Sequence, residues 1–289
     1  MMEYSVEVKN FSKHFKDFSL QNISFNVPTG TIVGFIGENG AGKTTTLKSI
    51  LGLLHTDGGE LRVLGKDPVK DRRSIGEDIG IVMEGSFFSP TLNMREIGSI
   101  MQKLHPRWDA AFFEEFCKRF ELPEQKPMKD FSRGMRVKAA FATALSHHPK
   151  LLILDEATSG LDPVVRSEIL DLFLEFIEDE SHSVLLSSHI TSDLEKVADY
   201  IVFIHKGRIV FQMEKDALLE KFAVCKCGKS ELSCFDKAHI LGHRESRFDM
   251  EFLVDNAPQV RKTYPNLLIE PASIDDIMTF FVKGSEEAI

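Results

Sequence analysis

A glycine-rich segment near the start of the chain has the residue types and spacing of a phosphate-binding loop. The residues GENGAGKTT, at 37 to 45, fit the pattern G-x-x-x-x-G-K-[ST] between a short apolar run and a predicted helix. Its glycines let successive backbone N–H groups face one point, and the helix start adds partial positive charge. Lys43 is expected to reach the β and γ phosphates of a nucleotide, and Thr44 to hold Mg²⁺. The predicted phosphate contacts come from Gly37, Asn39, Gly40, Ala41, Gly42, Lys43, Thr44 and Thr45.

Two adjacent carboxylates, Asp155 and Glu156, follow the apolar run LLIL. Ligands of open α/β sheets bind at the carboxyl ends of the strands, so Asp155 is expected to act as an acceptor near Mg²⁺. Glu156 is then positioned to orient and deprotonate an attacking water molecule. Two acids at the end of a strand are, by themselves, more often a solvated strand end. Together with the phosphate loop, the catalytic interpretation is favoured.

A third segment, FSRGM at 131 to 135, places Ser132 and Gly134 two residues apart at the start of a predicted helix. A hydroxyl and a backbone N–H at a helix N-terminus are suited to contact an anion such as a phosphate. A serine at this position is also a common helix N-cap. The residues alone leave both interpretations open.

The composition of the chain limits the classes of protein to which it can belong. With 43% apolar and 27% charged residues among 289, it is typical of a soluble globular protein. No run approaches the ~18 apolar residues of a membrane span, and the start MMEYSVEVKN lacks the features of a signal peptide. We therefore expect a cytoplasmic protein. The net charge of −9 argues against a general affinity for nucleic acid.

The four cysteines are expected to be reduced thiols in that compartment. Three of them are bunched near two histidines, but they lack C-x-x-C spacing and part of the segment reads as a β-strand, so a zinc site is the less favoured alternative. The residues concerned are Cys225, Cys227, Cys234, His239 and His243.

The elements that must position the polar motifs are short apolar strands alternating with helices. Strands are predicted at TIVGFI, ELRVL, IGIVM, LLILD and SVLLSS, with a hairpin at 200 to 211. This alternation indicates an α/β fold with a mainly parallel sheet covered on both faces. β-like runs in the first thirty residues predict an N-terminal antiparallel β subdomain. The helical pattern throughout 93 to 148 predicts an inserted α-helical subdomain over about 85–148.

We expect one domain over residues 1–220 and a small C-terminal α+β appendage over 221–289. The appendage contains two β-like runs, RFDMEFLV and NLLIEP, followed by a helix in SIDDIMTFFVKG. Ser273 is predicted to cap this helix, with Asp276 three residues further on.

The order of the motifs resembles that of the ATP-binding subunits of ABC transporters, over nearly all of residues 3–220. GENGAGKTT is followed by FSRGM, LLILDE, SGLD at 159 to 162 and SSHI, which contains His189. The resemblance implies a P-loop NTPase fold of the RecA-like type, with ATP and Mg²⁺ as cofactors and ATP hydrolysis as the activity. In that family the segment matching FSRGM is usually LSGGQ, and it closes over ATP held by a second, opposed subunit. Ser132 and Gly134 would therefore contact the nucleotide of the partner subunit.

The resemblance also implies roles for three further side chains. Phe15, in the register SKHF, would stack on adenine, and a core phenylalanine is the alternative. His189 would contact the γ-phosphate and hold Glu156 and the water in place, and a histidine with a structural role is the alternative. Asp162 would contact the phosphate loop of the opposed subunit, although capping of a helix beginning at Pro163 explains it equally well.

The chain departs from the family pattern at several positions. Arg133 replaces the usual first glycine of LSGGQ, and it could add a positive charge near the partner's nucleotide or point to water. Glu84 stands at the family's glutamine-loop position, where a carboxylate could take over a metal or water contact or remain a surface acid. Phe131 and Met135 replace the usual Leu and Gln. Ala157 stands where the family often has proline, which should affect loop stiffness more than chemistry.

The resemblance implies a subunit that supplies energy for transport. ATP would close two such chains, as a homodimer or heterodimer, and a separate integral membrane permease would convert the motion into transport. The chain would then lie at the inner face of the cell membrane. Phe87 and Phe88 could form an apolar groove for a permease helix, and a core location is the alternative.

Within the family, the region from KCGKSEL to the end resembles bacterial cassettes found beside peptide or antibiotic exporters. Two other functions are less favoured. A soluble ABC-type ATPase acting on ribosomes or DNA is disfavoured by the single cassette and the lack of sustained heptads. A nucleotide sensor with negligible turnover is disfavoured by Glu156.

Overall fold

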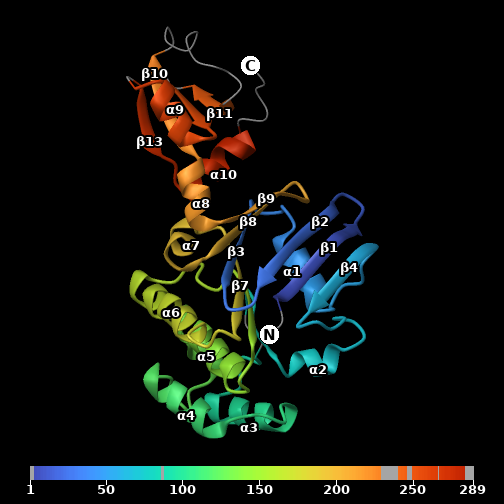
Figure 1. Ribbon diagram of the computed structural model, residues 1–289. Coiled ribbons are helices and arrows are strands. Elements are labelled where there is room, and N and C mark those ends of the chain that lie inside the picture. The colour runs from blue at the N-terminus through green and yellow to red at the C-terminus, as the bar shows by residue number, and fades with distance from the viewer. Residues whose placement is uncertain (1–2, 86–87, 229–239, 246–248, 266, 284–289) are drawn as a thin grey trace.

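A six-stranded sheet forms the centre of the computed structural model, which describes residues 3–85, 88–228, 240–245, 249–265 and 267–283 (Figure 1). Its strands are β5 (Ile79–Val82), β6 (Leu151–Asp155), β7 (Ser183–Ser188), β3 (Ile32–Ile36), β8 (Tyr200–His205) and β9 (Arg208–Glu214), in that spatial order. The first five strands are parallel, and β9 pairs antiparallel with β8 as a hairpin. The predicted mainly parallel sheet and the hairpin are therefore confirmed.

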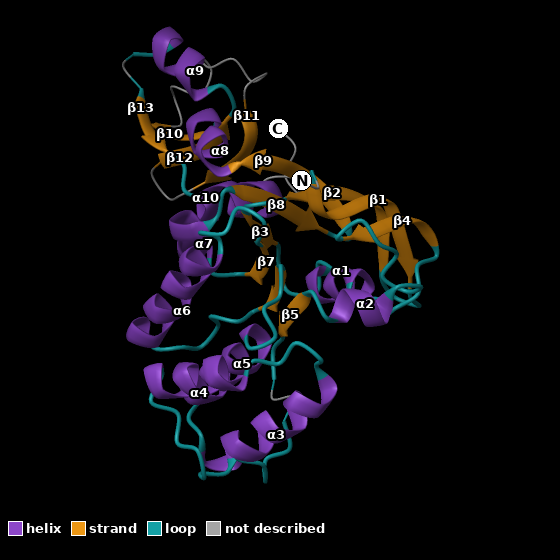
Figure 2. Ribbon diagram, turned by 60° about the horizontal axis from the view of Figure 1, so that its bottom comes forward, coloured by secondary structure: helices purple, strands orange, loops and turns teal. Residues whose placement is uncertain are grey.

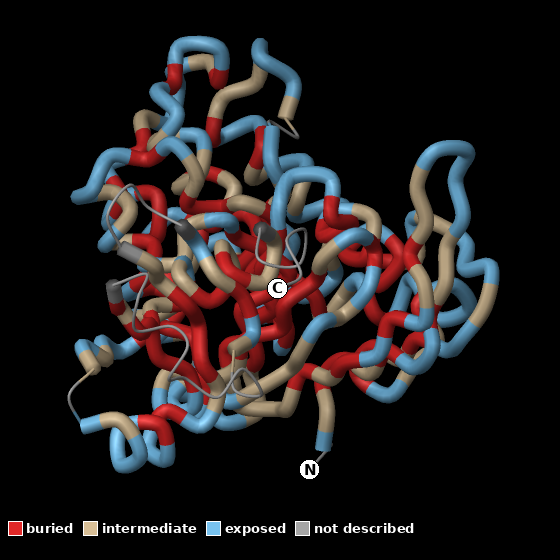
Figure 3. Tube along the Cα trace, turned by 90° about the horizontal axis from the view of Figure 1, so that it is seen from above, coloured by how far each residue is buried: buried red, intermediate tan, exposed pale blue. Residues whose placement is uncertain are grey.

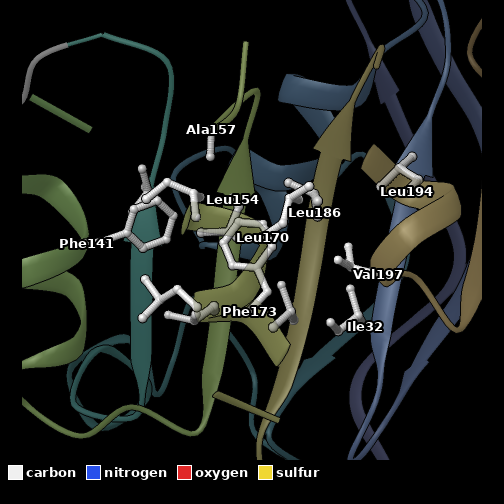
Figure 4. Packing of buried hydrophobic residues seen from close by; sticks show 14 of the residues in the cluster. Ile32, Phe141, Leu154, Ala157, Leu170, Phe173, Leu186, Leu194 and Val197 are labelled. Atoms are coloured by element: carbon white, nitrogen blue, oxygen red, sulfur yellow. The ribbon is translucent and has the colours of Figure 1, made fainter. Parts of the chain in front are cut away.

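Two hydrophobic cores cover the two faces of this sheet, which explains why its strands are apolar at consecutive positions. Along β3, Ile32 belongs to one core and Val33 to the other, because side chains alternate along a strand. Helix α1 (Lys43–Ile50) lies on the second face. The first face is covered by α5 (Arg133–Leu145), α6 (Pro163–Phe176) and α7 (Thr191–Val197). Figure 4 shows Phe141, Phe173 and Leu194 from these three helices in the same core as Leu154 and Leu186 of the strands.

The N-terminal region forms a separate antiparallel sheet, as predicted. It has the order β2-β1-β4, with β1 at Tyr4–His14, β2 at Ser19–Pro28 and β4 at Gly58–Val63. This sheet closes the core around α1 on the side away from α5 and α6 (Figure 2). A short helix, α2 (Arg72–Gly76), leads from it to β5.

The helical region lies at one end of the molecule and contains α3 (Met94–Leu104), α4 (Ala110–Arg119) and α5 (Figure 1). The sequence pattern predicts helix throughout 93–148, but residues 120–132 form no α-helix and contain only a 3₁₀ turn at Met128–Asp130. Proline explains the difference, because Pro106, Pro123 and Pro127 fall between the helices and proline disrupts a continuous helix. Asn93 begins α3 with a complete capping box, and Asp109 caps α4.

The C-terminal region contains an antiparallel sheet of order β11-β12-β10-β13, joined to β9 by α8 (Lys215–Lys221). Its elements are β10 (Ala223–Gly228), β11 (Ile240–Glu245), β12 (Asp249–Val254), α9 (Ala257–Thr263), β13 (Leu268–Pro271) and α10 (Ile274–Lys283). The predicted cap of α10 is present, since the Asp276 amide donates to Ser273 Oγ and Ser273 donates back to the Asp276 carboxylate. Seen from above, buried backbone runs through the middle of the molecule while exposed loops lie outside it (Figure 3).

The two cysteines of β10 are buried on one face of the C-terminal sheet. Cys225 and Cys227 share a hydrophobic cluster with residues of α9, and burial raises the pKa of the Cys225 thiol to about 12. A metal ligand must be a thiolate, so burial works against metal binding at Cys225. Cys234 and His239, the other candidates for the less favoured zinc site, lie outside the described residues.

No helix among the described residues is both long and apolar enough to cross a membrane.

Candidate functional site

The phosphate loop occupies the turn between β3 and α1, at the carboxyl end of the central strands. Two of its glycines have no room for a side chain. A Cβ on Gly37 would lie 2.4 Å from the Ile204 carbonyl oxygen, and one on Gly42, which has φ +113°, would lie 2.4 Å from Leu20. A Cβ on Gly40 would instead have no neighbour within 4 Å. The loop is thus packed tightly against the protein at its ends and open at its middle, where a phosphate would approach.

Lys43 lies buried beneath the loop and points back across it. Its Nζ donates hydrogen bonds to the carbonyl oxygens of Gly37, at 2.7 Å, and Glu38, at 3.3 Å. The same atom lies 3.6 Å from Glu156 Oε1. The ammonium group therefore lies within one site with the predicted general base, close to where phosphates would enter the loop.

Thr44 and Asp155 contact each other across the site. Thr44 Oγ1 donates to Asp155 Oδ2 at 2.7 Å, and Asp155 is buried with its other oxygen, Oδ1, lacking a hydrogen-bond partner within the described part of the chain. A buried carboxylate oxygen without a partner is costly unless a ligand satisfies it. Mg²⁺ prefers hydroxyl, carboxylate and water oxygens, so these two side chains fit the predicted ion.

Glu156 is held by both its backbone and its side chain. Its φ of +52° is left-handed, and its N–H donates to the Ser187 carbonyl oxygen of β7 at 2.9 Å. One carboxylate oxygen, Oε2, lies 2.5 Å from His189 Nδ1, while Oε1 faces Lys43. The structure thus brings the three predicted side chains together, with the carboxylate aimed between a cation and an imidazole.

Sequence reasoning gave Ser187 no role, although its carbonyl oxygen fixes the Glu156 backbone. Ser187 pairs in register with Asp155 in the adjacent parallel strand. Its place at the end of the apolar run SVLLSS was the only available signal.

Ser132, Gly134 and Asp162 lie together on another part of the surface. Ser132 caps α5, because its Oγ accepts from the Met135 amide at 3.2 Å, and Asp162 caps α6 through the amides of residues 164 and 165. A Cβ built on Gly134 would lie 3.3 Å from Val165 of α6, which places the two helix starts side by side. The capping explanation holds for Ser132 and Asp162, and both side chains are exposed and available for a further contact.

Phe15 lies in the turn between β1 and β2 and is 46% exposed. It lines an open hollow of about 520 Å³ together with Phe18, Gly40 of the phosphate loop and Lys206. Its ring centroid is 6.5 Å from that of Phe18. An exposed aromatic face beside the phosphate loop offers a stacking surface for a nucleotide base. The exposure of Phe15 argues against the alternative of a core phenylalanine.

Glu84 follows β5 and is exposed. With Glu156, Ala157 and Ser159 it lines a hollow of about 340 Å³, to which α5 contributes Arg133 and Arg136 among others. The structure therefore places Glu84 near the predicted base. In the neighbouring segment, Phe88 packs against the large core, in line with the alternative of a core location. Phe87 lies outside the described residues, so the groove formed by both stays a prediction.

Comparison with known proteins agrees with this geometry. A sequence model of the family described as ABC transporter matches residues 20–159. The bacitracin transport ATP-binding protein BcrA of Bacillus licheniformis is 32% identical over 251 residues, covering 86% of this chain and 81% of the relative. The lantibiotic transport ATP-binding protein SrtF of Streptococcus pyogenes is 33% identical over 217 residues, covering 73% and 91%.

Solved structures show the same fold. One described as the ATP binding subunit of an ABC transporter has a TM-score of 0.67 and 27% identity, covering 74% of this chain and 91% of that one. The phosphate loop, the paired acids and the matches to transport ATP-binding proteins lead to one conclusion. This chain belongs to the ABC transporter ATP-binding subunits, whose ATPase domain hydrolyses ATP to power transport.

Proposed function

We propose that this chain powers the export of a peptide antibiotic or a similar cargo through a separate integral membrane permease. The supporting observation is the extent of the match to the bacitracin transport protein. A match covering 86% of 289 residues extends past residue 220 into the C-terminal region, well beyond residues 20–159. The alternative of a soluble ATPase acting on ribosomes or DNA is not favoured, because these relatives are named as transport proteins.

In the proposed reaction, Glu156 accepts a proton from the attacking water while His189 Nδ1 holds the opposite carboxylate oxygen. Lys43 now donates to two loop carbonyls, and it would turn to the β and γ phosphates when these fill the loop. That movement releases Glu156 Oε1 from the ammonium group, leaving a carboxylate oxygen to receive the proton. Thr44 and Asp155 would hold Mg²⁺, which supplies neutralisation of phosphate charge.

The surface formed by Ser132, Gly134 and Asp162, in which both polar side chains are exposed, supports a dimer with two shared sites. In a two-fold arrangement each chain presents the same surface to the other, so Ser132 of one chain can face the phosphate loop of its partner. The partner is a second ATP-binding subunit, identical or related. The pair would sit on the inner face of the membrane, held there by the permease.

Glu156→Gln tests the catalytic assignment. ATP turnover should fall at least ~100-fold, because the proton acceptor is lost, while ATP affinity changes by less than about threefold, because every phosphate contact remains. The variant should also accumulate as a dimer with ATP. Phosphate release, nucleotide binding and size-exclusion elution measure these three properties. Turnover near the parent level would remove Glu156 from the role of base.

Transport is tested by co-expressing the chain with a candidate membrane permease in a host that is sensitive to bacitracin or a lantibiotic. The wild-type pair should raise the tolerated concentration of bacitracin or a lantibiotic several-fold, and the pair carrying Glu156→Gln should not. Both chains should co-purify from the membrane fraction. Equal tolerance with either pair, or no recovery with membranes, would contradict the proposed export function.

A further inference from the structure

The side chain of Arg133 lies over the backbone of Gly160 in its own chain. A Cβ built on Gly160 would lie 2.7 Å from Arg133 Cζ, 2.8 Å from Nη1 and 3.0 Å from Nε. Three atoms of the guanidinium group therefore occupy the space that a side chain at residue 160 would need. Such a close approach is possible because residue 160 has no side chain.

Gly160 belongs to the turn that connects the predicted base to α6. The turn begins at Glu156 and ends at Asp162, the N-cap of α6. Glu156 and Gly160 both have left-handed backbone conformations, with φ of +52° and +65°. A non-glycine residue in this conformation is strained by about 1 kcal/mol or more, and it persists only where its surroundings hold it.

The direction of Arg133 distinguishes between its possible partners. It is the first residue of α5, directly after Ser132, so a side chain serving an opposed subunit would extend away from its own chain. The guanidinium instead lies over Gly160 and lines the hollow that contains Glu84 and Glu156. Its planar group can pack on a peptide backbone while its charge lies at a hollow that is also lined by Glu84 and Glu156.

We propose that Arg133 is a positioning residue that acts within its own chain. It fixes the turn at 156–162 against the start of α5, and so keeps Glu156 aligned with Lys43 and His189. The role in hydrolysis rests on the proposed function of Glu156, whereas the contact with Gly160 does not. The proposal differs from a trans role for Arg133, in which the side chain would touch the partner's nucleotide.

Hydrogen exchange of the nucleotide-free protein tests the contact without requiring a dimer. The turn has amides that exchange can report, since the N–H of Ser159 donates to the Glu156 carbonyl and that of Leu161 to Thr158. Arg133→Ala should increase exchange in the peptide covering 156–162 at least threefold. Arg136→Ala is the matched control, because Arg136 lines the same hollow one helical turn along, whereas the three atoms nearest to a Cβ on Gly160 all belong to Arg133. No increase, or an equal increase in both variants, would overturn the proposal.

Steady-state kinetics test the consequence for hydrolysis. Arg133→Ala should lower kcat about 3- to 10-fold and leave KM for ATP within twofold, because the phosphate loop is untouched. Arg133→Lys should restore little, since an ammonium group cannot cover Gly160 as a plane does. A kcat loss that is equally large in Arg136→Ala would assign the effect to the charge of the hollow and contradict the role of the contact.

A double-mutant cycle connects the two residues. Gly160→Ala should displace the guanidinium and lower kcat, whereas adding it to Arg133→Ala should lower kcat much less. The strain of alanine at φ +65° is present in both backgrounds and cancels in the cycle. Independent, multiplicative losses would show that the residues do not act together.

Mixed dimers separate this proposal from the proposed dimeric function. One chain carries Glu156→Gln, leaving a single live site, and Arg133→Ala is placed either on the chain with intact Glu156 or on the other. The loss of kcat should follow the chain with intact Glu156. A loss confined to the other chain would establish the trans role instead. If ATP induces no dimer, the dimeric function fails, and hydrogen exchange still decides the role of Arg133.

Discussion

Glu156 has both a strained backbone conformation and the side chain that is predicted to act as the base. Its left-handed backbone turns the chain sharply after β6, so the side chain comes back over the strand ends and not outward into solvent. There it lies between Lys43 and His189. The contacts with Lys43 and His189 are consistent with the predicted role of Glu156 as a base. Because the backbone at Glu156 is strained, the turn after β6 needs contacts with other segments to hold it.

At this scale the assignment of Ser132 to an opposed subunit makes a sharp prediction. Ser132→Arg should leave ATP affinity of the monomer within about twofold, because Lys43 and Thr44 lie in a different part of the same chain. It should abolish ATP-driven dimerisation and turnover, since bulk and charge at 132 would obstruct the partner's nucleotide. Nucleotide binding, size-exclusion elution and phosphate release measure these effects.

Mixing two inactive variants provides the control for that prediction. A dimer of Ser132→Arg with Lys43→Ala has one site carrying both defects and one site carrying neither, so some ATPase activity should return. In a model where each chain uses only its own residues, mixing restores nothing. Absence of recovery, with mixed dimers shown to form, would refute the trans assignment.

Local sequence could predict the positions of the phosphate loop, Asp155 and Glu156, because each motif depends on fixed spacing within one short segment, the turn between β3 and α1 or the end of β6. The direction of Arg133 could not be predicted in this way. Whether its guanidinium meets water, a partner or Gly160 depends on how α5 packs against the turn before α6, a contact between segments 27 residues apart. The exposure of Phe15 likewise depends on the turn that carries it.

Among the elements, α7 connects the site to the C-terminal region. It begins at Thr191, two residues after His189, and its Glu195 Oε1 accepts a hydrogen bond from the Ile274 amide at the start of α10, at 2.9 Å. A carboxylate at a helix N-terminus satisfies an amide that has no partner within the helix, and it interacts favourably with the helix dipole. The sequence predicts the cap by Ser273, but not this second cap from another helix.

Glu195→Ala should lower the free energy of unfolding by about 1 kcal/mol, the usual effect of losing a helix cap. Glu220→Ala is the matched control, because Glu220 is exposed on α8. Its effect should be within about 0.5 kcal/mol of zero. Urea unfolding of both variants makes the comparison, and equal stability of the two would show that the Glu195 contact contributes nothing.

A buried histidine at the end of α5 predicts that the stability of the protein depends on pH. His147 is buried after this helix, its Nε2 lies 3.0 Å from the Ile79 carbonyl oxygen of β5, and its ring stacks on His105. Burial lowers the pKa of His147 below its ordinary value of 6.5. The unfolded chain therefore binds a proton more readily, and the free energy of unfolding should decrease as pH falls below about 6.5.

The urea midpoint measured between pH 7.5 and 5.5 tests this dependence. His147→Gln should reduce the slope, because glutamine does not titrate and its amide can still donate to the Ile79 carbonyl. His55→Gln should leave the slope unchanged, since His55 is exposed. An identical slope in the parent and His147→Gln would exclude His147 as the origin.

The sequence predicts the buried strands well because β3 and β6 are apolar at almost every position and β7 contains the apolar run Val184, Leu185 and Leu186. It misses α7, α8 and α9, each seven residues long, because two turns of helix give too little periodicity to detect. It also misses β11, in which Gly242 follows a register irregularity that breaks the regular alternation.

Across the whole molecule, the C-terminal region and the central sheet share one hydrophobic core. Phe281 of α10 packs near three aromatic rings, with centroid distances of 6.2 Å to Phe203, 5.8 Å to Phe211 and 6.0 Å to Phe222. Ile274 and Ile277 of α10 are buried in the same cluster as strands β6 and β7. The region is therefore joined to the site-bearing sheet by packing as well as by the Glu195 contact.

Phe281→Ala should lower the free energy of unfolding by about 2 to 4 kcal/mol, in proportion to the buried ring surface that is lost. Leu104→Ala, at a position 66% exposed, should change it by less than about 0.5 kcal/mol. If the shared core couples the regions, fluorescence and circular dichroism should report one transition in both variants. Separate melting of the C-terminal region in the parent protein would contradict this coupling.

The shared core also bears on how the protein can be subdivided for laboratory work. Cutting the chain after α8 would uncover the aromatic rings of β8 and β9 that α10 now covers, and would leave α7 without the helix start it caps. A truncated protein made in this way would expose a hydrophobic surface on the same sheet that carries its nucleotide site. Such a fragment is expected to aggregate at concentrations at which the intact chain remains in solution. Proteins made for studies of ATP hydrolysis should therefore retain α10.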